Sequence, residues 1–502
     1  MIRVQSRPVR QLRRVLKFQA RHATTDANEN AKKYHETVLK VVEAAAVTFA
    51  SVSILGLSGY AYHAYYQQRV LRKIRHAFNS DTAQSAMTDG DWIAREEQSV
   101  IDKAVNGTTR GRYYLLIGEK GTGKTSMLLE AVRRVGGLKC AMFEAHADPE
   151  IVRIRLGKAV EYNFHEDYIG SLFSIRGPRD TTALLDIERA FDKLEEFAAK
   201  EVQNSDGRPL VLIVNSTHLL REDEDGVNLV ELLQQRAESF AASGLVTMIF
   251  NSDDYWVYER FKKLGTRLDV VTVRDLNRAQ SVEALKIWRR KYFATDKLDD
   301  TLCNKLYDIV GGRPQFLNRV AQHSDMLAHA RAVVENERIW LLNQCGLLGA
   351  DMDDDVMETG KFSSSAMLLV KALVEMQTEH MQTNNGNPPE HFLPSLPLWR
   401  ARQIMTRPDY IQRYDNLNIF TIDSHSNVRA DSVPMMDAFR QIATEPGFND
   451  LLNETLDRVS QIESLGRTRE LVAKDLIKGR YRITRENKNE LVVALESPDE
   501  DE

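Results

Sequence analysis

The stretch RYYLLIGEKGTGKTSMLLEAV, residues 112–132, decides the fold of this chain. Its apolar run 113–117 predicts a buried strand, and the apolar positions that follow the glycines recur with the period of a helix. Between the two, residues 118–125 fit the pattern GxxxxGK[ST], in which glycines let backbone N–H groups curl around phosphate oxygens. Lys124 is expected to reach the β- and γ-phosphates, and Thr125 to bind Mg²⁺. The stretch therefore predicts a phosphate-binding P-loop with ATP or ADP and Mg²⁺ as cofactors.

Downstream of this loop, strand-like and helical segments alternate, as a doubly wound parallel sheet requires. A long amphipathic helix is predicted over residues 181–202. The expected strands are 139–147, 209–215, 244–252 and 267–273. The predicted fold class is therefore α/β, with the P-loop at the edge of a parallel sheet.

The nucleotide module resembles the AAA+ superfamily of P-loop NTPases, and more closely its initiator-like and STAND branches. Arg95 and Glu96, in WIAREEQSVIDKAV, match an Arg-Glu pair that precedes the sheet in those proteins, and Ala94 stands where glycine is usual. The resemblance covers about residues 90–330, and the P-loop is its most specific motif. It implies a P-loop domain that is closed by a helical lid.

A second motif, VGGRPQFL at residues 310–317, resembles the lid signature of these branches. In that signature a Gly-x-Pro turn, here Gly312, Arg313 and Pro314, closes over the adenine. The resemblance therefore implies that Arg313 and Pro314 contact the cofactor. The plain alternative is a helix C-cap at the glycines, with Pro314 as a stop signal.

Two further positions are implied by the family alone. Asn251 ends the strand after Asn215, where the family keeps a polar sensor of the γ-phosphate. Arg267 stands just before the last strand, where the family places an arginine finger that serves a neighbouring subunit. Asn251 could instead form an Asx turn, and Arg267 could be a solvated cation at a helix end.

The strand LVLIVNSTHLL, residues 210–220, raises a question about catalysis. In the family this strand ends on an acid that binds Mg²⁺ through water, followed by the base that orients the attacking water. Here Asn215 and Ser216 occupy these places, and neither brings a negative charge. Nearby candidates are the acids of REDEDG, which we interpret as a solvated loop, and His218, which we interpret as a helix-face residue. We therefore predict tight nucleotide binding with slow or absent hydrolysis.

The predicted site comprises three overlapping sets of residues. The candidate catalytic residues are Lys124, Asn215, Asn251 and Arg267. The candidate Mg²⁺ ligands are Thr125 and Asn215. The candidate cofactor-binding residues are Arg95, Glu119, Lys120, Gly121, Thr122, Gly123, Lys124, Thr125, Ser126, Arg313 and Pro314.

The N-terminus predicts a targeting segment followed by a membrane span. Residues 1–25 carry seven Arg and Lys and no acid, with apolar residues between them, as a mitochondrial presequence does. A disordered basic arm is the alternative. Residues 44–62 contain no charge, and at 1.5 Å per residue they nearly cross a hydrocarbon core of ~30 Å, so we predict a transmembrane helix over residues 44–66. A buried soluble helix would read similarly, because small residues dominate the stretch.

A presequence and one span together predict the mitochondrial inner membrane, and a membrane protein of fungal type. Arrest of the span during import would leave the bulk of the chain in the intermembrane space, which we favour because it needs no second sorting step. The basic residues after the span favour the matrix instead. The side of the membrane therefore stays open.

The C-terminal third predicts a winged helix at residues 361–445, the module that follows the lid in initiator and STAND proteins. An amphipathic helix opens it, and the alternation NIFTIDSHSNVRADS suits a β-hairpin. The module holds 8 Lys+Arg and 9 Asp+Glu, so it offers no surface that neutralises DNA phosphates. We expect the wing to pack against the nucleotide module, and the charge balance of the module disfavours nucleic acid as a partner.

The whole chain of 502 residues has a formal net charge of −5, which gives no global basic field. Its three cysteines, Cys140, Cys303 and Cys345, show neither zinc nor disulfide spacing. The predicted segments are a presequence (1–25), a polar segment (26–43), a transmembrane helix (44–66), a linker (67–89), a P-loop domain (90–275), a lid (276–350), a winged helix (361–445), C-terminal helices (446–490) and an acidic tail (491–502).

These features predict a membrane-anchored nucleotide-binding protein that works as a homo-oligomeric switch or scaffold. One alternative is a remodelling ATPase of the inner membrane, which needs hydrolysis and a substrate-gripping pore loop. Residues 163–173 are the one candidate for that loop. Another alternative is an initiator-like mitochondrial DNA-binding protein. The protein partner is not specified by the sequence.

Overall fold

The computed structural model describes residues 9–78, 92–162, 164, 182–204, 207–294, 298–383, 392–478, 480–487 and 490–496. The start of the presequence, the candidate pore loop 163–173 apart from residue 164, and the tail from 497 lie outside the described residues. The chain divides into two compact units. Residues 1–73 and 163–180 form the first unit, and residues 74–162 and 181–502 form the second.

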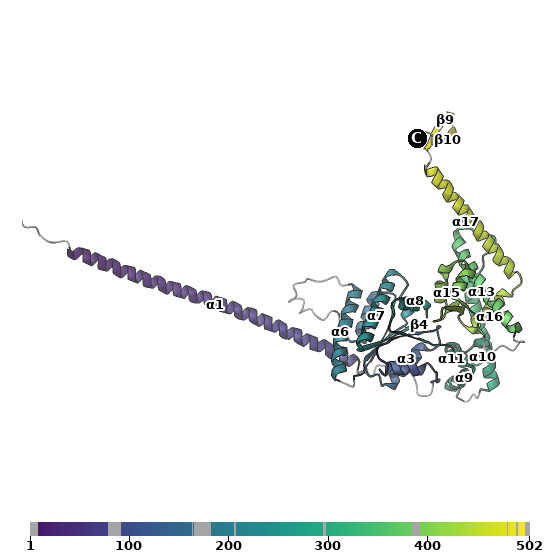
Figure 1. Cartoon of the computed structure of the whole chain (residues 1–502), viewed down its shortest axis with the longest axis horizontal. Coiled ribbons are helices and arrows are strands. Elements are labelled where there is room, and N and C mark those ends of the chain that lie inside the picture. Colours follow the sequence, from purple (N-terminus) through teal and green to yellow (C-terminus); the bar gives the residue numbers. More distant parts are fainter. Residues whose placement is uncertain are drawn as a thin grey trace, which may run out of the picture. The chain divides into compact units, whose positions relative to one another are not determined.

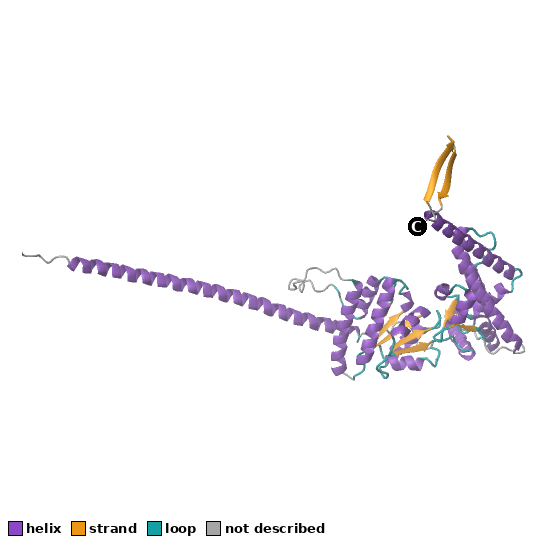
Figure 2. Ribbon diagram, turned by 45° about the horizontal axis from the view of Figure 1, so that its top comes forward, coloured by secondary structure: helices purple, strands orange, loops and turns teal. Residues whose placement is uncertain are grey.

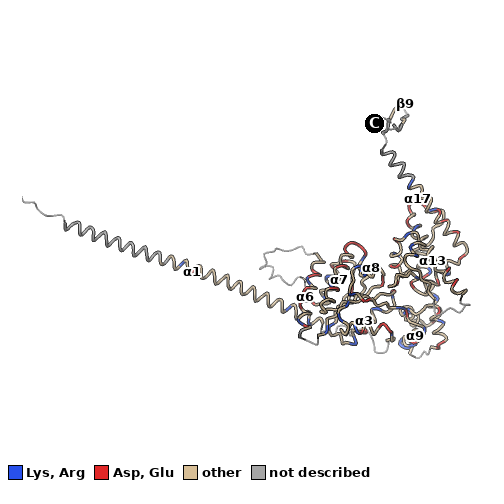
Figure 3. Tube along the Cα trace, in the orientation of Figure 1, with Lys and Arg blue, Asp and Glu red and all other residues tan. Residues whose placement is uncertain are grey.

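The first unit contains most of one long helix, α1 (Val9–Ala77). The sequence predicts a polar segment at 26–43 and a linker from 67, but the helix continues through both up to Ala77. Ala, Lys, Glu and Leu favour helix there, and no proline interrupts the stretch after Pro8. In the described part of α1, Thr37–Ala77 has a mean hydropathy of 1.9 over its most apolar window, none of it buried. Its length and composition suffice to cross a membrane, and Figure 3 shows a run free of blue and red in the half of α1 nearer Ala77.

The second unit is built on a parallel five-stranded sheet with the order β2-β3-β4-β1-β5 (Figure 2). The strands are β1 (Tyr113–Ile117), β2 (Cys140–Glu144), β3 (Leu210–Asn215), β4 (Val246–Ser252) and β5 (Leu268–Thr272). The predicted parallel sheet and its strands are confirmed. Because all strands are parallel, their carboxyl ends meet at one edge of the sheet, where the P-loop lies.

Helices cover both faces of this sheet, so its three inner strands, β1, β3 and β4, are buried along their whole length. Tyr114 and Leu116 pack with residues of α2 (Gln98–Val105) and α3 (Lys124–Arg134). On the other face the ring of Tyr113 meets Phe250 and Phe261 edge-on, at centroid distances of 6.4 and 6.2 Å. Figure 1 shows α3 on one side of the sheet and α7 and α8 on the other. The remaining helices of the module are α4 (Pro149–Ala159), α6 (Ala183–Asn204), α7 (Glu224–Ser243) and α8 (Tyr255–Leu264).

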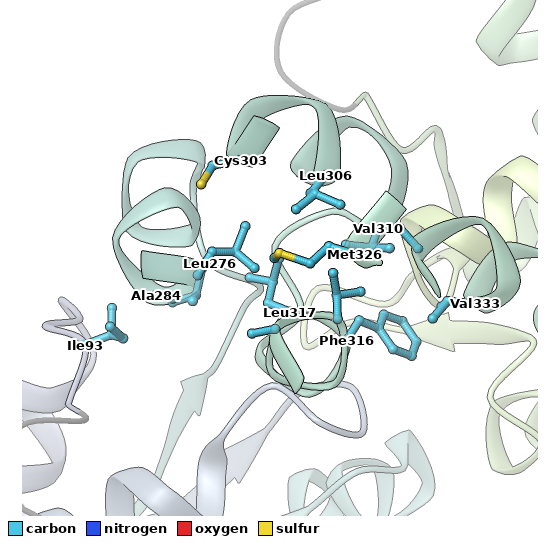
Figure 4. Packing of buried hydrophobic residues seen from close by; sticks show 14 residues of the cluster. Ile93, Leu276, Ala284, Cys303, Leu306, Val310, Phe316, Leu317, Met326 and Val333 are labelled. Carbon is cyan, nitrogen blue, oxygen red and sulfur yellow. The ribbon is translucent and has the colours of Figure 1, made fainter. Parts of the chain in front are cut away.

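The helical lid follows β5 and has its own apolar core, shown in Figure 4. It consists of α9 (Arg278–Tyr292), α10 (Asp300–Val310), α11 (Pro314–Gln322) and α12 (Met326–Cys345). Leu285, Leu306 and Leu317 are fully buried in this core. Ile93, which precedes the sheet in the sequence, joins the same cluster and so links the lid to the start of the module.

The predicted winged helix is confirmed. Its helices are α13 (Met357–Thr383), α14 (Leu398–Met405), α15 (Ile411–Asn416) and α16 (Val433–Ala443). Strands β6 (Ser395–Pro397), β7 (Phe420–Ile422) and β8 (Asn427–Ala430) form its sheet, in the order β6-β8-β7. The predicted hairpin corresponds to β7 and β8, joined by a turn in which Ser426 has a positive φ of 62°.

The C-terminal segment differs from the prediction of helices to residue 490 and a solvated tail after it. The helix α17 (Phe448–Lys478) is followed by two antiparallel strands, β9 (Arg480–Asn487) and β10 (Glu490–Glu496). Apolar and polar residues alternate in YRIT at the start of β9, and β10 contains the short apolar run LVVAL with two β-branched valines, both of which suit strands.

Candidate functional site

The P-loop joins β1 to α3 in a conformation that requires its glycines. Gly121 and Gly123 have φ values of +84° and +94°, which side chains rarely adopt. A Cβ atom at Gly121 would also lie 2.2 Å from Oε1 of Gln315, at the start of the lid helix α11. The Gln315 backbone N–H donates to the Gly121 carbonyl oxygen over 3.2 Å. The loop and the lid are therefore in direct contact.

A cavity of about 490 Å³ opens beside this loop. Its polar side is formed by loop residues 121–127 and by Ser216, Asn251 and Asp253 at the carboxyl ends of β3 and β4. Its other walls are formed by Trp92, Ile93, Arg95, Leu276, Trp288, Lys291, Tyr292, Pro314, Gln315 and Asn318. An apolar, aromatic wall facing a glycine-rich loop is the arrangement that suits a purine base and its polyphosphate.

Lys124 is buried at the base of the cavity. Its Nζ donates to the carbonyl oxygens of Gly118 and Glu119 at 2.7 and 2.8 Å, and it lies 2.8 Å from Oδ1 of Asp253. An ammonium has three N–H donors, so these three contacts can satisfy all of them. Lys124 must therefore exchange at least one of these partners when it binds a phosphate.

The three polar residues predicted at the edge of the sheet form one network. Thr125 Oγ1 lies 3.1 Å from Asn215 Oδ1, and Asn251 Nδ2 lies 3.0 Å from Thr125 Oγ1 and 2.5 Å from Asn215 Oδ1. Asn251 therefore does not form the Asx turn that was its alternative role, because such a turn needs Oδ1 as an acceptor, whereas the contacts of Asn251 are made by Nδ2, to Thr125 of α3 and Asn215 of β3. Its Oδ1 is buried and has no hydrogen-bond partner among the described residues.

This network fits a hydrated metal ion. The oxygens of Thr125 and Asn215 are suitable ligands for Mg²⁺, which in nucleotide sites keeps several waters. The orphaned Oδ1 of Asn251 can accept a hydrogen bond from such a water. The residues present thus fit the cofactors that the sequence predicts, and Mg²⁺ held there would neutralise negative charge on the phosphates.

Asp253 and His218 were not predicted as site residues. The backbone N–H of Asp253 donates to His218 Nδ1 over 3.2 Å, and His218 Nε2 lies 3.6 Å from Asp253 Oδ2. Burial lowers the pKa of His218, and Asp253 opposes this effect only in part. Because Nδ1 accepts, the neutral ring carries its proton on Nε2, on the side of Asp253. The sequence signal for Asp253 was an acid just beyond the end of β4.

Arg95 is hydrogen-bonded to the P-loop and to the segment that follows β5. Its Nη1 donates to the Thr122 carbonyl oxygen over 2.6 Å, and its Nη2 donates to the carbonyl oxygen of Arg274, which follows β5. Arg95 also lines the cavity. The position implied by the family resemblance is therefore next to the candidate site.

Arg313 is not placed as predicted. Pro314 lines the cavity, but the side chain of Arg313 does not line it and is buried between Asp275 and Asp431 of the winged helix. A buried guanidinium needs carboxylates to stabilise its charge, and Asp275 and Asp431 provide them on the side away from the cavity. Arg313 thus joins the lid to the winged helix.

Glu119 and Lys120 also lie apart from the cavity, although the sequence predicts that they bind the cofactor. Lys120 is exposed and does not line the cavity. Glu119 is 6% exposed and forms an ion pair with Arg429, on strand β8 of the winged helix. The loop residues that do line the cavity are Gly121, Thr122, Gly123, Lys124, Thr125 and Ser126.

Arg267 lies at the amino ends of the strands, whereas the cavity lies at their carboxyl ends. It immediately precedes β5, and in the parallel register β1 and β5 run from Tyr113 and Leu268 to Ile117 and Thr272. Its Nη1 lies 3.0 Å from Oε1 of Glu238 on α7. Arg267 therefore cannot act on the cavity of its own subunit.

Two regions of the chain match protein-family models. Residues 91–248 match the model described as AAA ATPase domain. Residues 343–463 match the model described as fungal AAA protein, C-terminal winged helix domain. No curated protein matches the chain.

Similar solved structures cover most of this chain at low identity. The Walker-type ATPase paby2304 of Pyrococcus abyssi is 14% identical, with a TM-score of 0.45, over 70% of this chain and 97% of that one. Cdc6p from Pyrobaculum aerophilum is 12% identical, with a TM-score of 0.36, over 75% and 98%. The ORC2 protein of Aeropyrum pernix, in ADPNP-ADP complexes, is 10% identical, with a TM-score of 0.40, over 78% and 98%. None of these similarities assigns a role to a residue of this chain.

Proposed function

The chain carries an AAA ATPase domain followed by a fungal AAA winged helix domain, and we propose that it binds ATP or ADP as a membrane-anchored, homo-oligomeric switch or scaffold. The observation that carries the proposal is the ion pair between Glu119 of the P-loop and Arg429 of the winged helix. Through this pair, a rearrangement of the loop around a phosphate acts directly on the module that follows the lid.

Other contacts join the winged helix to the same edge of the sheet. The Tyr255 backbone N–H, at the start of α8, donates to Asp415 Oδ2 of α15 over 2.8 Å. The Tyr255 hydroxyl lies 2.8 Å from Ser426 Oγ in the turn of the wing. Thr272 Oγ1, at the end of β5, lies 2.7 Å from Ser424 Oγ. The docked winged helix thus touches the ends of strands that flank the P-loop, which supports a role as a nucleotide sensor.

The energetics of this interface suit a switch. Glu119 and Arg429 are largely removed from water. Separating them without giving each charge a new partner would leave a buried charge uncompensated, which is costly in free energy. A ligand can shift the equilibrium between docked and undocked states only by its differential affinity for the two. A nucleotide that draws Lys124 away from Asp253 and reorders the loop beside Glu119 has the means to provide such a difference.

We expect hydrolysis to be slow or absent in this subunit. Asn215 and Ser216 stand where an acid pair is usual, and neither can take up a proton near neutral pH. The purified protein tests this by its release of phosphate. Release at several per second with Mg²⁺, abolished in Lys124→Ala, would instead support the alternative of a remodelling ATPase.

The third candidate, DNA binding, is disfavoured by the same interface. The helix α15, which lies between the first helices and the β7–β8 hairpin of the winged helix, packs against α8, and Asp415 is buried there. A recognition helix in this position is not free to enter a groove. Salt-dependent retention on DNA would contradict our proposal.

The anchor is α1, and we place it in the mitochondrial inner membrane with the bulk of the chain in the intermembrane space. The basic first 25 residues and the uncharged stretch 44–62 support this location. Protease protection of the second unit in intact mitochondria and in mitoplasts tests the side of the membrane. Protection that persists in mitoplasts would place the unit in the matrix.

Hydrogen exchange of the full chain in mild detergent tests the switch. We expect that ADP and a non-hydrolysable ATP analogue change exchange differently in β7 and β8 and at the start of α8. Lys124→Ala is expected to abolish both changes, and Lys263→Ala, on exposed helix surface, is the matched control. Identical exchange with and without saturating nucleotide would refute the switch while leaving binding intact.

A further inference from the structure

We propose that Asp253 is the carboxylate of the nucleotide site, which brings to it from β4 the negative charge that β3 lacks. Its role is that of a positioning residue for the Mg²⁺ that accompanies the nucleotide. This inference rests on the proposed function, because it concerns the same cavity. It adds an acid to the site at which the sequence places the uncharged Asn215 and Ser216.

The sheet order places Asp253 beside the P-loop. Strand β4 lies between β3 and β1, and its last residue, Ser252, pairs with Ile117, the last residue of β1. Asp253 therefore leaves β4 at the level where Gly118 leaves β1 to begin the loop. Because parallel strands end at one edge, an acid on β4 can reach the same space as an acid on β3.

The contacts of Asp253 are those of a site residue. Its Oδ1 is 2.8 Å from Lys124 Nζ, and the two side chains are 18% and 3% exposed. The other oxygen, Oδ2, faces His218 Nε2 at 3.6 Å, while the Asp253 backbone N–H is bound to His218 Nδ1. The carboxylate is thus held on both sides, between the loop lysine and a neutral histidine.

Other acids near this edge are arranged differently. Among the described residues that line the cavity, Asp253 is the only Asp or Glu. Glu144 ends β2, is exposed, and lies 3.4 Å from Ser216 Oγ through its Oε1. Asp254 lies beside Asp415 at the winged helix, away from the cavity lining. Of these three acids, only Asp253 lines the cavity, and we therefore assign it to the nucleotide site.

A carboxylate beside a polyphosphate has opposite effects with and without a cation. Without Mg²⁺ it repels the phosphates, and it also competes with them for Lys124. With Mg²⁺, carboxylates and phosphates share the ion, as is usual in nucleotide sites. The gain in nucleotide affinity on adding Mg²⁺ is thus the quantity that reports on Asp253, and it needs no turnover.

Calorimetry on the full chain in mild detergent tests the inference, with ADP and a non-hydrolysable ATP analogue, in Mg²⁺ and in EDTA. In the wild type we expect Mg²⁺ to raise the affinity for the ATP analogue by about tenfold or more. Asp253→Asn should lose most of this gain and bind more tightly than the wild type in EDTA. Asp253→Glu should keep part of the gain, since it keeps the charge.

The control is Glu144→Gln. It removes the acid at the end of β2, the strand on the other side of β3, and should keep the full gain in affinity on adding Mg²⁺. Asn215→Asp in the Asp253→Asn background should restore the gain, because it returns an acid to β3. An unchanged Mg²⁺ gain in Asp253→Asn, or its loss in Glu144→Gln, overturns the inference while the nucleotide-binding proposal stands. A wild type that binds neither nucleotide refutes the proposed function itself.

Discussion

Arg313 and Asp431 form a buried ion pair between the lid and the winged helix. The same guanidinium donates through Nε to Asp275 Oδ1 over 3.2 Å, and its side chain is 2% exposed. Burial alone would lower the pKa of Arg313, but the charges of Asp275 and Asp431 outweigh burial and raise it. One cation therefore holds two carboxylates that come from different domains.

Replacing this arginine should destabilise the second unit strongly. Arg313→Met leaves Asp275 and Asp431 without their shared cation, and we expect a loss of about 3–5 kcal/mol in the free energy of unfolding. Thermal unfolding of the full chain in detergent measures it. Arg331→Met, on the exposed surface of α12, is the control and should change little. A small effect of Arg313→Met would mean that the pair contributes no net stability.

The stability of the winged-helix interface should fall as the pH rises. Burial, and then the charge of Asp253, raise the pKa of Asp254 to about 7, and burial raises the pKa of Asp415 well above its usual range. An acid with a raised pKa binds its proton more tightly in the folded state, so it stabilises that state at low pH and ceases to do so as the pH passes the folded pKa. The loss should occur between about pH 4 and pH 7.

Asp254→Asn tests this pH dependence, because the amide mimics the protonated acid. We expect the thermal midpoint of the wild type to fall relative to that of the variant as the pH is raised from about 4.5 to about 7.5, the range in which the buried acids titrate. Asp225→Asn, in an exposed part of the chain, should leave the wild-type pH profile unchanged. Parallel profiles for the wild type and Asp254→Asn would contradict the prediction.

A methyl group on the P-loop should separate it from the lid. In Gly121→Ala the new Cβ would lie 2.2 Å from Gln315 Oε1 and 2.7 Å from Gln315 Cβ, so α11 must move. We expect nucleotide affinity to fall by about tenfold or more, since Pro314 and Gln315 line the cavity. Gly136→Ala is a matched control: its φ is +66°, but its Cβ meets nothing within 4 Å. Both variants carry the backbone strain, so their difference isolates the contact.

Glu119 and Arg429 should show strong energetic coupling. Singly, Glu119→Gln or Arg429→Met leaves a largely buried charge without its partner, and the double variant removes both. We expect a coupling energy of about 1–3 kcal/mol in a double-mutant cycle on thermal or denaturant unfolding. The more exposed pair Glu335 and Arg338, one turn apart on α12, is the control, and its coupling energy should not exceed about 0.5 kcal/mol. Additive effects at Glu119 and Arg429 would argue against the connection between loop and wing.

Charges in the apolar part of α1 should release the chain from membranes. Ile54 and Leu55 are 67% and 63% exposed, and on insertion scales an arginine at the centre of a span costs about 2.5–3.5 kcal/mol. We expect the double variant Ile54→Arg/Leu55→Arg to be extracted by alkaline carbonate, and the wild type to resist it. Leu138→Arg changes an exposed leucine of the nucleotide module and should not affect extraction. Extraction of the wild type itself would remove the case for a membrane span.

The sequence predicted what depends on local patterns and on parallel-strand geometry. The spacing of Gly118, Gly123, Lys124 and Thr125 determined the loop, and apolar runs determined the strands that hold it. Asn215 was predicted as an Mg²⁺ ligand together with Thr125, and Asn251 as a γ-phosphate sensor from the family resemblance; because β3 and β4 are neighbouring strands, their amides lie 2.5 Å apart. A shared edge of a sheet can thus be inferred without knowing any side-chain rotamer.

What the sequence could not predict depends on partners that are distant along the chain. The motif around Arg313 gives no direction for its side chain, which turns to Asp431, 118 positions later. Glu119 was predicted to bind the cofactor because it lies in the loop, but Arg429 draws it to the winged helix. Asp253 could have been found, since an acid one residue after the end of β4 must lie near the loop.

Arg267 and Lys124 lie at opposite edges of one parallel sheet. If Arg267 contacts a nucleotide, that nucleotide is bound by a second copy of the chain. The cavity of the first copy would then receive Arg267 from a third copy. Such head-to-tail contacts have no two-fold axis, so they close into a ring or continue as a helical filament. An isologous dimer would leave Arg267 without a phosphate to reach.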